Sequence, residues 1–326
     1  MKKLFIKLFS YGILFVISLE ILVRVFHLAK DTPVRFADER KVEKWVPNQK
    51  GHSVTGNRRQ NFSEYRINSS GFNSYREFSP SREKVEIALV GDSFIEGFHQ
   101  NYYNSIGRKI ENKLPKVEVY EYGYAGYDLA DQLHLINVYK EQFDLIDIVI
   151  LGLKFENDLT RPKYEVVQSR LALESKTNRL IKKSKLLVYL NSIGVISNIR
   201  SFVNDTKYLI RFKNKGKNAR TNQNKQNNGK GKYEEYLKNF ESLVSTYGFD
   251  KKRFYFLIDE TITPSKFLDY LKINNYRFIK IGESLKQSEK PVTLIYDRHW
   301  NDRGRDIVAK EILKKTKHKK LGFHEE

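Results

Sequence analysis

The sequence contains no cysteine and far less acidic than basic charge. Without cysteine, the 326-residue chain can form no disulfide, no thiolate metal site and no cysteine nucleophile, and it has no lipobox. That absence is compatible with either side of a membrane. Lys and Arg together number 59 and Asp and Glu 39, which gives a formal net charge of +20. Such an excess favours contact with an anionic partner, such as lipid headgroups, an acidic glycan or nucleic acid.

The composition nevertheless supports a folded core. Hydrophobic residues make up 40% of the chain and aromatic residues 13%, which argues against global disorder. The chain is about twice as long as a typical domain, so it holds either one large α/β domain or two small ones. No internal repeat is visible in the sequence.

The N-terminal region carries a long apolar run. Leu8 to Leu28 has the length that a helix needs to cross a bilayer, and lysines precede it. Glu20 and Arg24 interrupt the run, and their spacing lets them pair on one face of a helix. We expect an uncleaved signal anchor over residues 1–29, a single-pass helix with the bulk of the chain on the extracytoplasmic side. A cleaved signal peptide and a buried amphipathic helix are the alternatives.

Beyond residue 84, short apolar runs alternate with helical patterns. Alternation at a spacing of roughly thirty residues is typical of βαβ units and a parallel sheet. The predicted strands cover residues 85–90, 117–122, 146–151, 254–258, 276–281 and 292–296. The chain is therefore predicted to have an α/β fold built on a parallel sheet.

The predicted organisation is one domain with additions. Residues 30–84 are polar and turn-rich and are expected to wrap onto the domain, which extends over residues 85–326. A basic insert at residues 160–245 interrupts that domain. Within the insert, residues 213–232 are predicted to be a disordered loop, because their few apolar side chains cannot bury enough surface to order them.

One serine stands where open α/β sheets place their ligand sites. Gly91-Asp92-Ser93 directly follows the first predicted strand and precedes a helix. At a helix N-terminus the backbone dipole stabilises developing negative charge, which makes Ser93 a candidate nucleophile. The alternative is that Ser93 only caps the next helix, which serine does well.

A histidine with a nearby carboxylate follows the last predicted strand. Asp297 and His299 are separated by one residue and precede the C-terminal helix. A serine hydroxyl becomes a good nucleophile when a base such as histidine accepts its proton, and a carboxylate can orient that base. A surface histidine beside a helix-capping aspartate is the alternative. Of the other histidines, His52, His99 and His134 lack such a carboxylate in their loop, although His99 is close to Ser93 in sequence.

These residues resemble the motifs of the SGNH hydrolases, also called the GDSL esterase/lipase superfamily. The four blocks of that family occur in order, as Gly91-Asp92-Ser93, Gly123-Tyr124-Ala125-Gly126, Asn157-Asp158 and Asp297-Arg298-His299-Trp300-Asn301. The blocks depart from the family pattern in having Glu121 in place of an asparagine, a longer spacing from Gly152 to Asn157, and one residue instead of two between Asp297 and His299. The resemblance covers about residues 85–159 and 250–316.

The resemblance implies a three-layer αβα, flavodoxin-like SGNH fold and a role for each of five residues. Ser93 would be the nucleophile, His299 its base and Asp297 the carboxylate that orients the base. The backbone N–H groups of Ser93 and Gly126 and the side-chain amide of Asn157 would form the oxyanion hole. No metal and no cofactor are implied.

The activity predicted on this basis is hydrolysis or transfer of an acyl ester, with an O-acetyl or short acyl group on a cell-envelope glycan as the expected substrate. The sequence leaves hydrolase and O-acyltransferase open. The alternative is a non-catalytic SGNH-like protein that binds or assembles envelope glycans. Anionic lipid or an anionic polymer is the expected partner of the basic insert. No nucleic acid is expected, because the anchor directs the domain outward and the basic residues concentrate in the low-complexity loop and the C-terminal tail.

Overall fold

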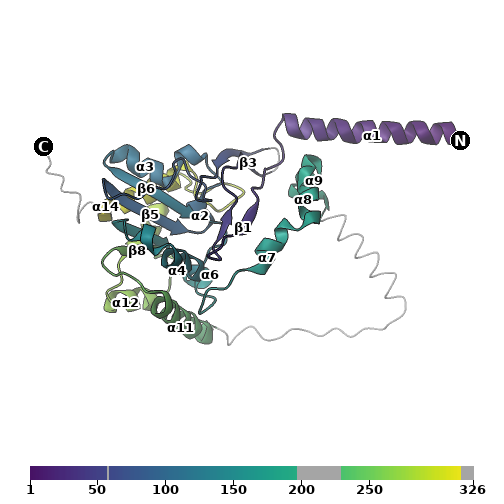
Figure 1. The fold of residues 1–326 in the computed structure, drawn as a ribbon. Helices are drawn as coiled ribbons and strands as arrows, with labels where there is room; N and C mark the ends of the chain where they lie inside the picture. The colour runs from purple at the N-terminus through teal and green to yellow at the C-terminus, as the bar shows by residue number, and fades with distance from the viewer. Residues whose placement is uncertain (57–58, 197–228, 317–326) are drawn as a thin grey trace, which may run out of the picture.

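A five-stranded parallel sheet forms the centre of the computed structural model, which describes residues 1–56, 59–196 and 229–316 (Figure 1). Its strands lie in the order β6-β5-β7-β8-β9. They are β5 (Val85–Gly91), β6 (Val117–Gly123), β7 (Ile148–Gly152), β8 (Phe254–Ile258) and β9 (Phe278–Lys280). This is the order of flavodoxin-like doubly wound sheets, and the predicted α/β class with a parallel sheet is confirmed.

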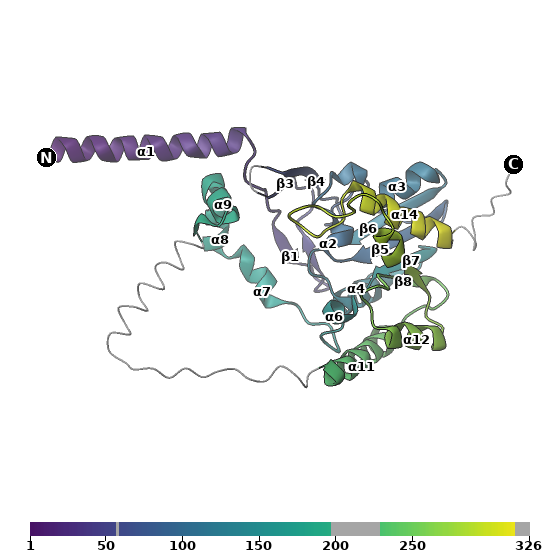
Figure 2. The same cartoon turned by 180° about the vertical axis from the view of Figure 1, so that it is seen from behind.

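Both faces of the sheet are buried because its strands point apolar side chains in both directions. In β5, Ala88 and Val90 face one core, whereas Ile87 and Leu89 face the other. The first face is covered by α4 (Leu129–Val138), α11 (Gly229–Tyr247) and α12 (Ser265–Ile273), and the second by α3 (Ile106–Lys113), α13 (Gly282–Lys286) and α14 (Asp302–Thr316). The three expected layers are visible in Figure 2.

Shorter helices connect these elements. They are α2 (Ser93–Glu96), α5 (Lys140–Phe143), α6 (Phe155–Asp158), α7 (Gln168–Leu171), α8 (Lys176–Lys183) and α9 (Lys185–Ser192), with 3₁₀ turns at Tyr102–Asn104 and Ala172–Glu174. Of these, α2 and α6 follow the carboxyl ends of β5 and β7, which are neighbours in the sheet.

The segment 30–84 builds two small antiparallel pairs. Strand β1 (Arg35–Ala37) pairs with β2 (Glu43–Trp45), and β3 (Lys50–Thr55) pairs with β4 (Asn61–Arg66). The apolar side chains of this segment belong to the core on the α4 side, and the most buried of them are Val42, Trp45, Tyr65, Ile67 and Phe72. The segment is therefore packed into the domain as well as wrapped around it.

The prediction of a strand at residues 292–296 is wrong. The backbone bonds of this segment stay within its own loop, because Leu294 N–H donates to the carbonyl of His299 and Asn301 N–H to that of Val292. Among the described residues, this segment forms one isolated β-bridge, between Thr293 and Trp300. The apolar residues thus stabilise a hairpin-like loop that leads into α14.

Two predicted boundaries of the insert also differ from the structure. Of the loop predicted to be disordered, residues 213–228 lie outside the described residues, whereas residues 229–232 form the first turn of α11. A helix extends at little cost once it is nucleated, which explains the earlier start. Phe240 and Leu243 of α11 are fully buried in the core, so this helix covers the sheet, and the insert predicted to continue to residue 245 ends before it.

Helix α1 (Lys2–Val25) projects away from the domain (Figure 1). Its 24 residues make it, within the described ranges, the one helix long and apolar enough to cross a membrane, and most of its side chains are exposed. Arg24 Nε lies 2.8 Å from Glu20 Oε1, so the two charges of the apolar run pair as expected.

Candidate active site

The loop between β5 and α2 presents Ser93 at the carboxyl edge of the sheet. Asp92 has an extended backbone and caps α2, since its side chain accepts the N–H of Phe94 at 2.9 Å. Ser93 is the first residue of that helix, and Gly97 ends it in a left-handed conformation. Ser93 thus stands at a helix N-terminus, as expected, but the side chain that caps this helix is that of Asp92 and not that of Ser93.

A glycine lets β6 approach this turn closely. A Cβ atom added to Gly123 would lie 2.1 Å from the backbone nitrogen of Glu96, a distance that no real side chain tolerates. The end of β6 therefore packs directly on α2. Gly123, the first residue of the Gly123-Tyr124-Ala125-Gly126 motif, is required here because two backbones are in contact.

The structure brings three of the sequence-predicted residues together. His299 Nε2 lies 2.7 Å from Ser93 Oγ, although the two residues are 206 positions apart. His299 Nδ1 is hydrogen-bonded to Asp297 Oδ1, which also accepts the His299 backbone N–H at 3.1 Å. A hydroxyl, an imidazole and a carboxylate thus form a continuous hydrogen-bonded chain, the arrangement in which a histidine can accept the proton of a serine.

A second histidine, which sequence reasoning set aside, joins this chain. His99 Nε2 lies 2.8 Å from Asp297 Oδ2, and its ring stacks on that of His299 with a centroid separation of 3.9 Å. Burial, reinforced by neighbouring His299, lowers the pKa of His99 to about 4. His99 is therefore neutral at pH 7. No local pattern marked it, because its partner is nearly 200 residues away in the sequence.

Asp297 is held as a carboxylate by these neighbours. Burial alone would raise its pKa, but the hydrogen bonds from His299 and the proximity of His99 outweigh burial and lower it. Each of its two oxygens accepts from a different imidazole, Oδ1 from His299 and Oδ2 from His99. The one-residue spacing between Asp297 and His299 is thus compatible with a bond between the two side chains.

The N-terminal segment holds the loop that carries His99. Asn61 Nδ2 donates to the carbonyl of His99 at 3.1 Å, and Glu64 N–H donates to Asn101 Oδ1 at 2.9 Å. Both donors lie on β4, so the β3–β4 pair fixes the loop between α2 and α3. This support could not be read from the sequence, in which residues 30–84 show only polar and turn-rich composition.

A buried carboxyl group ties the same segment to the turn that holds Ser93. Glu96 accepts from Trp45 Nε1 at 2.7 Å and from the backbone N–H of Ala125 at 3.1 Å. Its side chain is almost completely buried, and burial raises its pKa to about 7. Glu96 therefore joins β2, α2 and the loop after β6 at one point below the site.

Of the two expected oxyanion residues, Gly126 lies in the loop after β6 and Asn157 lies on α6, the short helix after β7. Gly126 has a positive φ of 93°, and within the described residues its N–H has no hydrogen-bond acceptor. Asn157 is exposed on α6, and its side-chain amide likewise has no partner in the described part of the chain. Both groups are free to bind a ligand oxygen.

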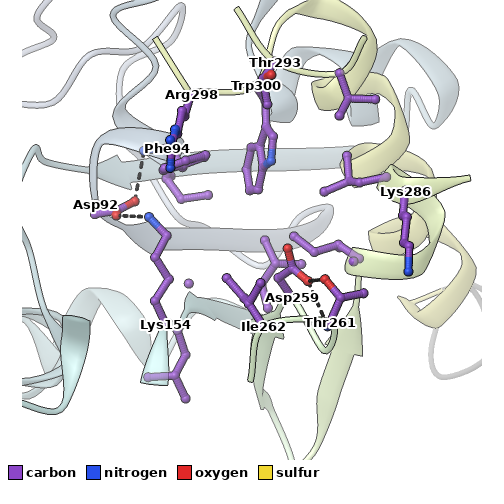
Figure 3. Close-up of a pocket in the computed structure, with 18 of the residues that line it drawn as sticks. Asp92, Phe94, Lys154, Asp259, Thr261, Ile262, Lys286, Thr293, Arg298 and Trp300 are labelled. Atoms are coloured by element: carbon purple, nitrogen blue, oxygen red, sulfur yellow. Dashed lines mark hydrogen bonds and ion pairs between the residues drawn. The ribbon is translucent and has the colours of Figure 1, made fainter. Parts of the chain in front are cut away.

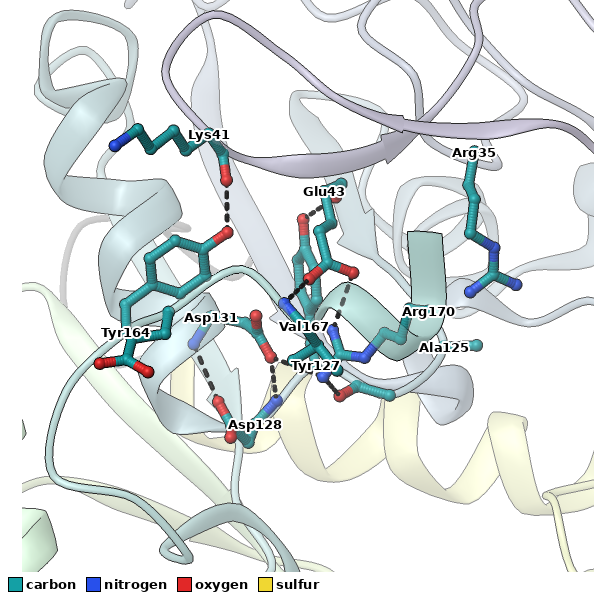
Figure 4. A network of polar contacts seen from close by, with 12 residues as sticks. Arg35, Lys41, Glu43, Ala125, Tyr127, Asp128, Asp131, Tyr164, Val167 and Arg170 are labelled. Atoms are coloured by element: carbon teal, nitrogen blue, oxygen red, sulfur yellow. Dashed lines mark hydrogen bonds and ion pairs between the residues drawn. The ribbon is translucent and has the colours of Figure 1, made fainter. Parts of the chain in front are cut away.

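A buried polar network fixes the loop that carries Gly126 (Figure 4). Arg170 donates from Nη2 to the carbonyl of Gly126 at 2.6 Å and pairs with the carboxylates of Glu43 and Asp131 at 3.2 Å each. Glu43 is fully buried and comes from β2. Three distant segments thus meet behind Gly126.

Lys154 is a second site residue that the sequence did not single out. Its Nζ lies 2.6 Å from Asp92 Oδ2 and 3.7 Å from the centre of the Phe94 ring (Figure 3). These two residues flank Ser93 in the chain. Lys154 occupies the second position after Gly152, at the start of the longer spacing to Asn157. A cation therefore stands beside the serine turn.

A cavity of about 340 Å³ adjoins this turn (Figure 3). Phe94 contributes to its wall and also contacts the rings of His299 and Trp300, with centroid separations of 4.5 and 4.7 Å. Most of its lining is apolar, including Leu153, Leu257, Ile262, Ile281, Leu285 and Val292. The cavity could accommodate an apolar group next to the serine.

The two histidines and the aspartate of the site, His99, His299 and Asp297, are also a possible set of metal ligands. One ligand atom from each of His99, Asp297 and His299 lies within 4.8 Å of the other two. Both Asp297 oxygens, His99 Nε2 and both nitrogens of His299 take part in hydrogen bonds to one another or to Ser93, whereas His99 Nδ1 is buried and has no partner in the described part of the chain.

Comparison with known proteins gives weak likenesses in fold. No family model and no curated protein matches the chain. A member of the lipolytic protein G-D-S-L family from Veillonella parvula DSM 2008 is 14% identical and aligns over 72% of this chain and 100% of that chain, with a TM-score of 0.37. A psychrotrophic esterase from Pseudoalteromonas sp. is 10% identical over 70% and 94%, with a TM-score of 0.39. A carbohydrate acetylesterase family member from Sinorhizobium meliloti is 11% identical over 72% and 97%, with a TM-score of 0.33. Likenesses at this level carry no inference about activity.

Proposed function

We propose that the chain is a serine esterase of the SGNH type. The observation that carries this proposal is the hydrogen-bonded chain from Asp297 through His299 to Ser93, at the carboxyl ends of the parallel strands. The imidazole of His299 is bonded to Asp297 through Nδ1, and its Nε2 lies 2.7 Å from Ser93 Oγ. A serine gains nucleophilicity in this arrangement, because its proton can pass to the imidazole as it attacks.

The reaction proceeds in two displacements. Ser93 Oγ attacks the ester carbonyl while its proton moves to His299 Nε2, and Asp297 stabilises the imidazolium that forms. The imidazolium then protonates the alcohol oxygen, the C–O bond breaks, and an acyl-serine remains. His299 then takes a proton from a water molecule as the water attacks the acyl carbon. The bond from that carbon to Ser93 Oγ breaks, the carboxylic acid leaves, and the imidazolium returns its proton to Ser93 Oγ. If a sugar hydroxyl replaces the water, the same site transfers the acyl group.

The oxyanion of each tetrahedral intermediate is bound by the N–H groups of Ser93 and Gly126 and by the amide of Asn157. The absence of other partners for the Gly126 and Asn157 donors in the described part of the chain supports this assignment. Fixed donors of this kind act where negative charge develops, and each is typically worth 10²–10³ in rate.

His99 serves as a positioning residue. Its Nε2–H donates to Asp297 Oδ2 and leaves Oδ1 for His299, and its ring covers one face of the base. Because His99 is neutral at pH 7, it does not compete with His299 for the charge of the carboxylate. The expected effect is a fixed orientation of the pair.

The substrate proposed is an O-acetyl or short acyl ester on a cell-envelope glycan. The apolar lining of the cavity beside Phe94 supports an acyl group there. Charged side chains of both signs, among them Lys154, Arg298 and Asp259, also line the cavity and suit a polar remainder such as a sugar. Helix α1, which within the described residues is the one helix long and apolar enough to span a bilayer, supports anchoring of the enzyme in a membrane. The lysines that precede it favour a domain on the outer side.

A hydrolysis assay tests the proposal. The full-length protein in detergent is incubated with p-nitrophenyl esters from acetyl to octanoyl and with an O-acetylated glycan, beside Ser93→Ala. Release of nitrophenol or acetate that Ser93→Ala abolishes supports the esterase. A folded wild-type protein that cleaves none of them, yet binds the glycan, would instead favour the non-catalytic glycan-binding alternative.

A further inference from the structure

The C-terminal half of the apolar helix α1 is bonded to the basic segment after α7. Glu20 accepts three hydrogen bonds from the start of α9, from Ser184 Oγ at 2.9 Å, Lys185 N at 2.9 Å and Leu186 N at 2.8 Å. The carboxylate thereby satisfies N–H groups that a helix start leaves open. These bonds explain why an apolar helix carries an acidic residue.

A second bond and an apolar contact hold the two helices together. Arg24 Nη2 donates to the carbonyl of Lys183 at 2.6 Å. Val23, Ala29 and Leu186 form a small buried cluster, with flanking residues of α1 and α9 packed on it. The attachment therefore combines polar and apolar contacts, and α9 lies beside the C-terminal end of α1 in both views of the fold (Figures 1 and 2).

This attachment sets the depth of α9 relative to a bilayer. Glu20 lies about 9 Å along the helix axis from Phe26, where the exposed apolar surface of α1 ends. If α1 spans the hydrocarbon core, residues near Phe26 lie at its outer boundary, and the start of α9, which is bonded to Glu20, lies about 9 Å inside it, a depth to which interfacial helices bury their apolar face. Helices α8 and α9 are then in the interfacial region.

The side chains of α8 and α9 suit that depth. Leu180, Ile181 and Leu187 are 68%, 47% and 40% exposed and have no apolar cover of their own. From Ser175 to Ser192 the sequence has five basic residues and no acidic one. Arg179 and Lys182 pair with Glu174, and Lys185 pairs with Asp31. Lys176 and Lys183 have no ion pair within the described residues. A helix with exposed leucines on one side and lysines around them is typical of segments that lie in the headgroup region of anionic membranes.

We propose that α8 and α9 form an interfacial foot that rests on the anionic phospholipid surface around α1, with Leu180 and Ile181 in the acyl boundary and Lys176 and Lys183 on lipid phosphates. The foot is defined as residues 175–192. It would fix the orientation of the domain over the membrane instead of leaving it on a free tether. This inference rests on the membrane anchoring proposed above and is independent of the esterase chemistry.

The absence of cysteine makes a direct test possible, because any introduced cysteine is unique in the chain. Full-length Leu180→Cys, Ile181→Cys, Leu14→Cys and Ile273→Cys are labelled with the environment-sensitive dye NBD. Each is reconstituted into phosphatidylcholine vesicles with or without phosphatidylglycerol. Quenching by lipids with a nitroxide near the headgroup or deep in the acyl chain reports the depth of each label.

The proposal predicts that labels at residues 180 and 181 lose about half or more of their fluorescence to the shallow nitroxide in phosphatidylglycerol vesicles, since interfacial helices sit 5–10 Å into the boundary. A label at residue 14 should respond to the deep nitroxide, and one at residue 273, exposed on α12, to neither. Combined Lys176→Gln and Lys183→Gln should lower the quenching at residue 180 to its value in neutral vesicles.

Three outcomes would overturn the proposal. If residue 14 is quenched but residues 180 and 181 are not, the anchor stands and the foot does not. If residue 14 is not quenched, both the anchor and the foot are wrong. If residue 273 is quenched as strongly as residue 180, the domain contacts lipid without a specific face.

Discussion

The two sides of the candidate site are held in different ways. Ser93 stands at the end of a fully buried central strand, and its turn is fixed by the close packing of Gly123 on α2. His299 stands on a loop whose β-pairing is one isolated bridge and which includes the exposed side chain of Ile295. The nucleophile is thus positioned by the sheet, whereas the base is positioned by side chains around it, chiefly Asp297, His99 and Phe94. Substitutions on the two sides should therefore fail differently.

The largest effect is expected on the side of the sheet. Ser93→Ala removes the nucleophile and should lower kcat by about 10³-fold or more, because the remaining groups cannot replace a covalent step. The fold should persist, since the Ser93 side chain caps nothing. Steady-state ester hydrolysis measures the loss, and Ser265→Ala, an exposed serine at the start of α12, is the matched control. Full activity in Ser93→Ala would refute the assigned nucleophile.

The oxyanion assignment gives the next effect. Asn157→Ala should reduce kcat by about 10²–10³-fold with little change in KM, because the amide acts on charge that exists only in the transition state. Asn157→Asp, which keeps the shape but loses the donor, should be at least as impaired. Unchanged turnover in both variants would remove Asn157 from the oxyanion hole.

A smaller effect is expected on the side of the base. His99→Phe keeps a ring against His299 but loses the bond to Asp297, and should cost about tenfold in kcat, as expected for part of one charged hydrogen bond. His99→Gln can still donate to Asp297 and should recover most of that loss. The pH profile of kcat/KM should change shape in His99→Phe and not in His99→Gln. Equal activity of all three proteins would show that His99 does not position the pair.

Glu96 supports the turn of Ser93 from below, and its substitution should change the stability of the fold more than the rate of ester hydrolysis. Folding raises the pKa of Glu96 from 4.5 to about 7, so the folded state binds more protons between these values. The stability that this group contributes is complete below about pH 4.5 and is lost as the pH rises to about 7, by up to about 3 kcal/mol. Glu96→Gln should remove this part of the pH dependence.

Thermal unfolding of both proteins in detergent at pH 5 and pH 8 measures the difference. Wild type should lose more stability than Glu96→Gln over this interval. An equal change in the two proteins would mean that Glu96 titrates normally in the folded state.

The same contrast between the two sides explains what the sequence could predict. The apolar runs of β5, β6 and β7 mark buried parallel strands, and the turn residues after them mark the edge where Ser93 stands. The pairing of Asp297 with His299 was also visible as a local pattern. His99 and Lys154 were missed, because their partners are distant in sequence and only the folded chain brings them together. Residues 30–84 were predicted to wrap onto the domain, but their burial in its core and their bonds to the loop of His99 could not be predicted, for the same reason.

Covalent labelling tests the central claim most directly. Full-length protein is treated with a small fluorophosphonate and a long-chain one, and the adduct is measured by intact mass and located by peptide mapping. The account predicts one adduct on Ser93, none on Ser93→Ala, a strongly slowed reaction for His299→Ala and normal labelling of Ser265→Ala. A folded wild-type protein that neither probe labels, or an adduct that persists in Ser93→Ala, would contradict an activated serine at this site.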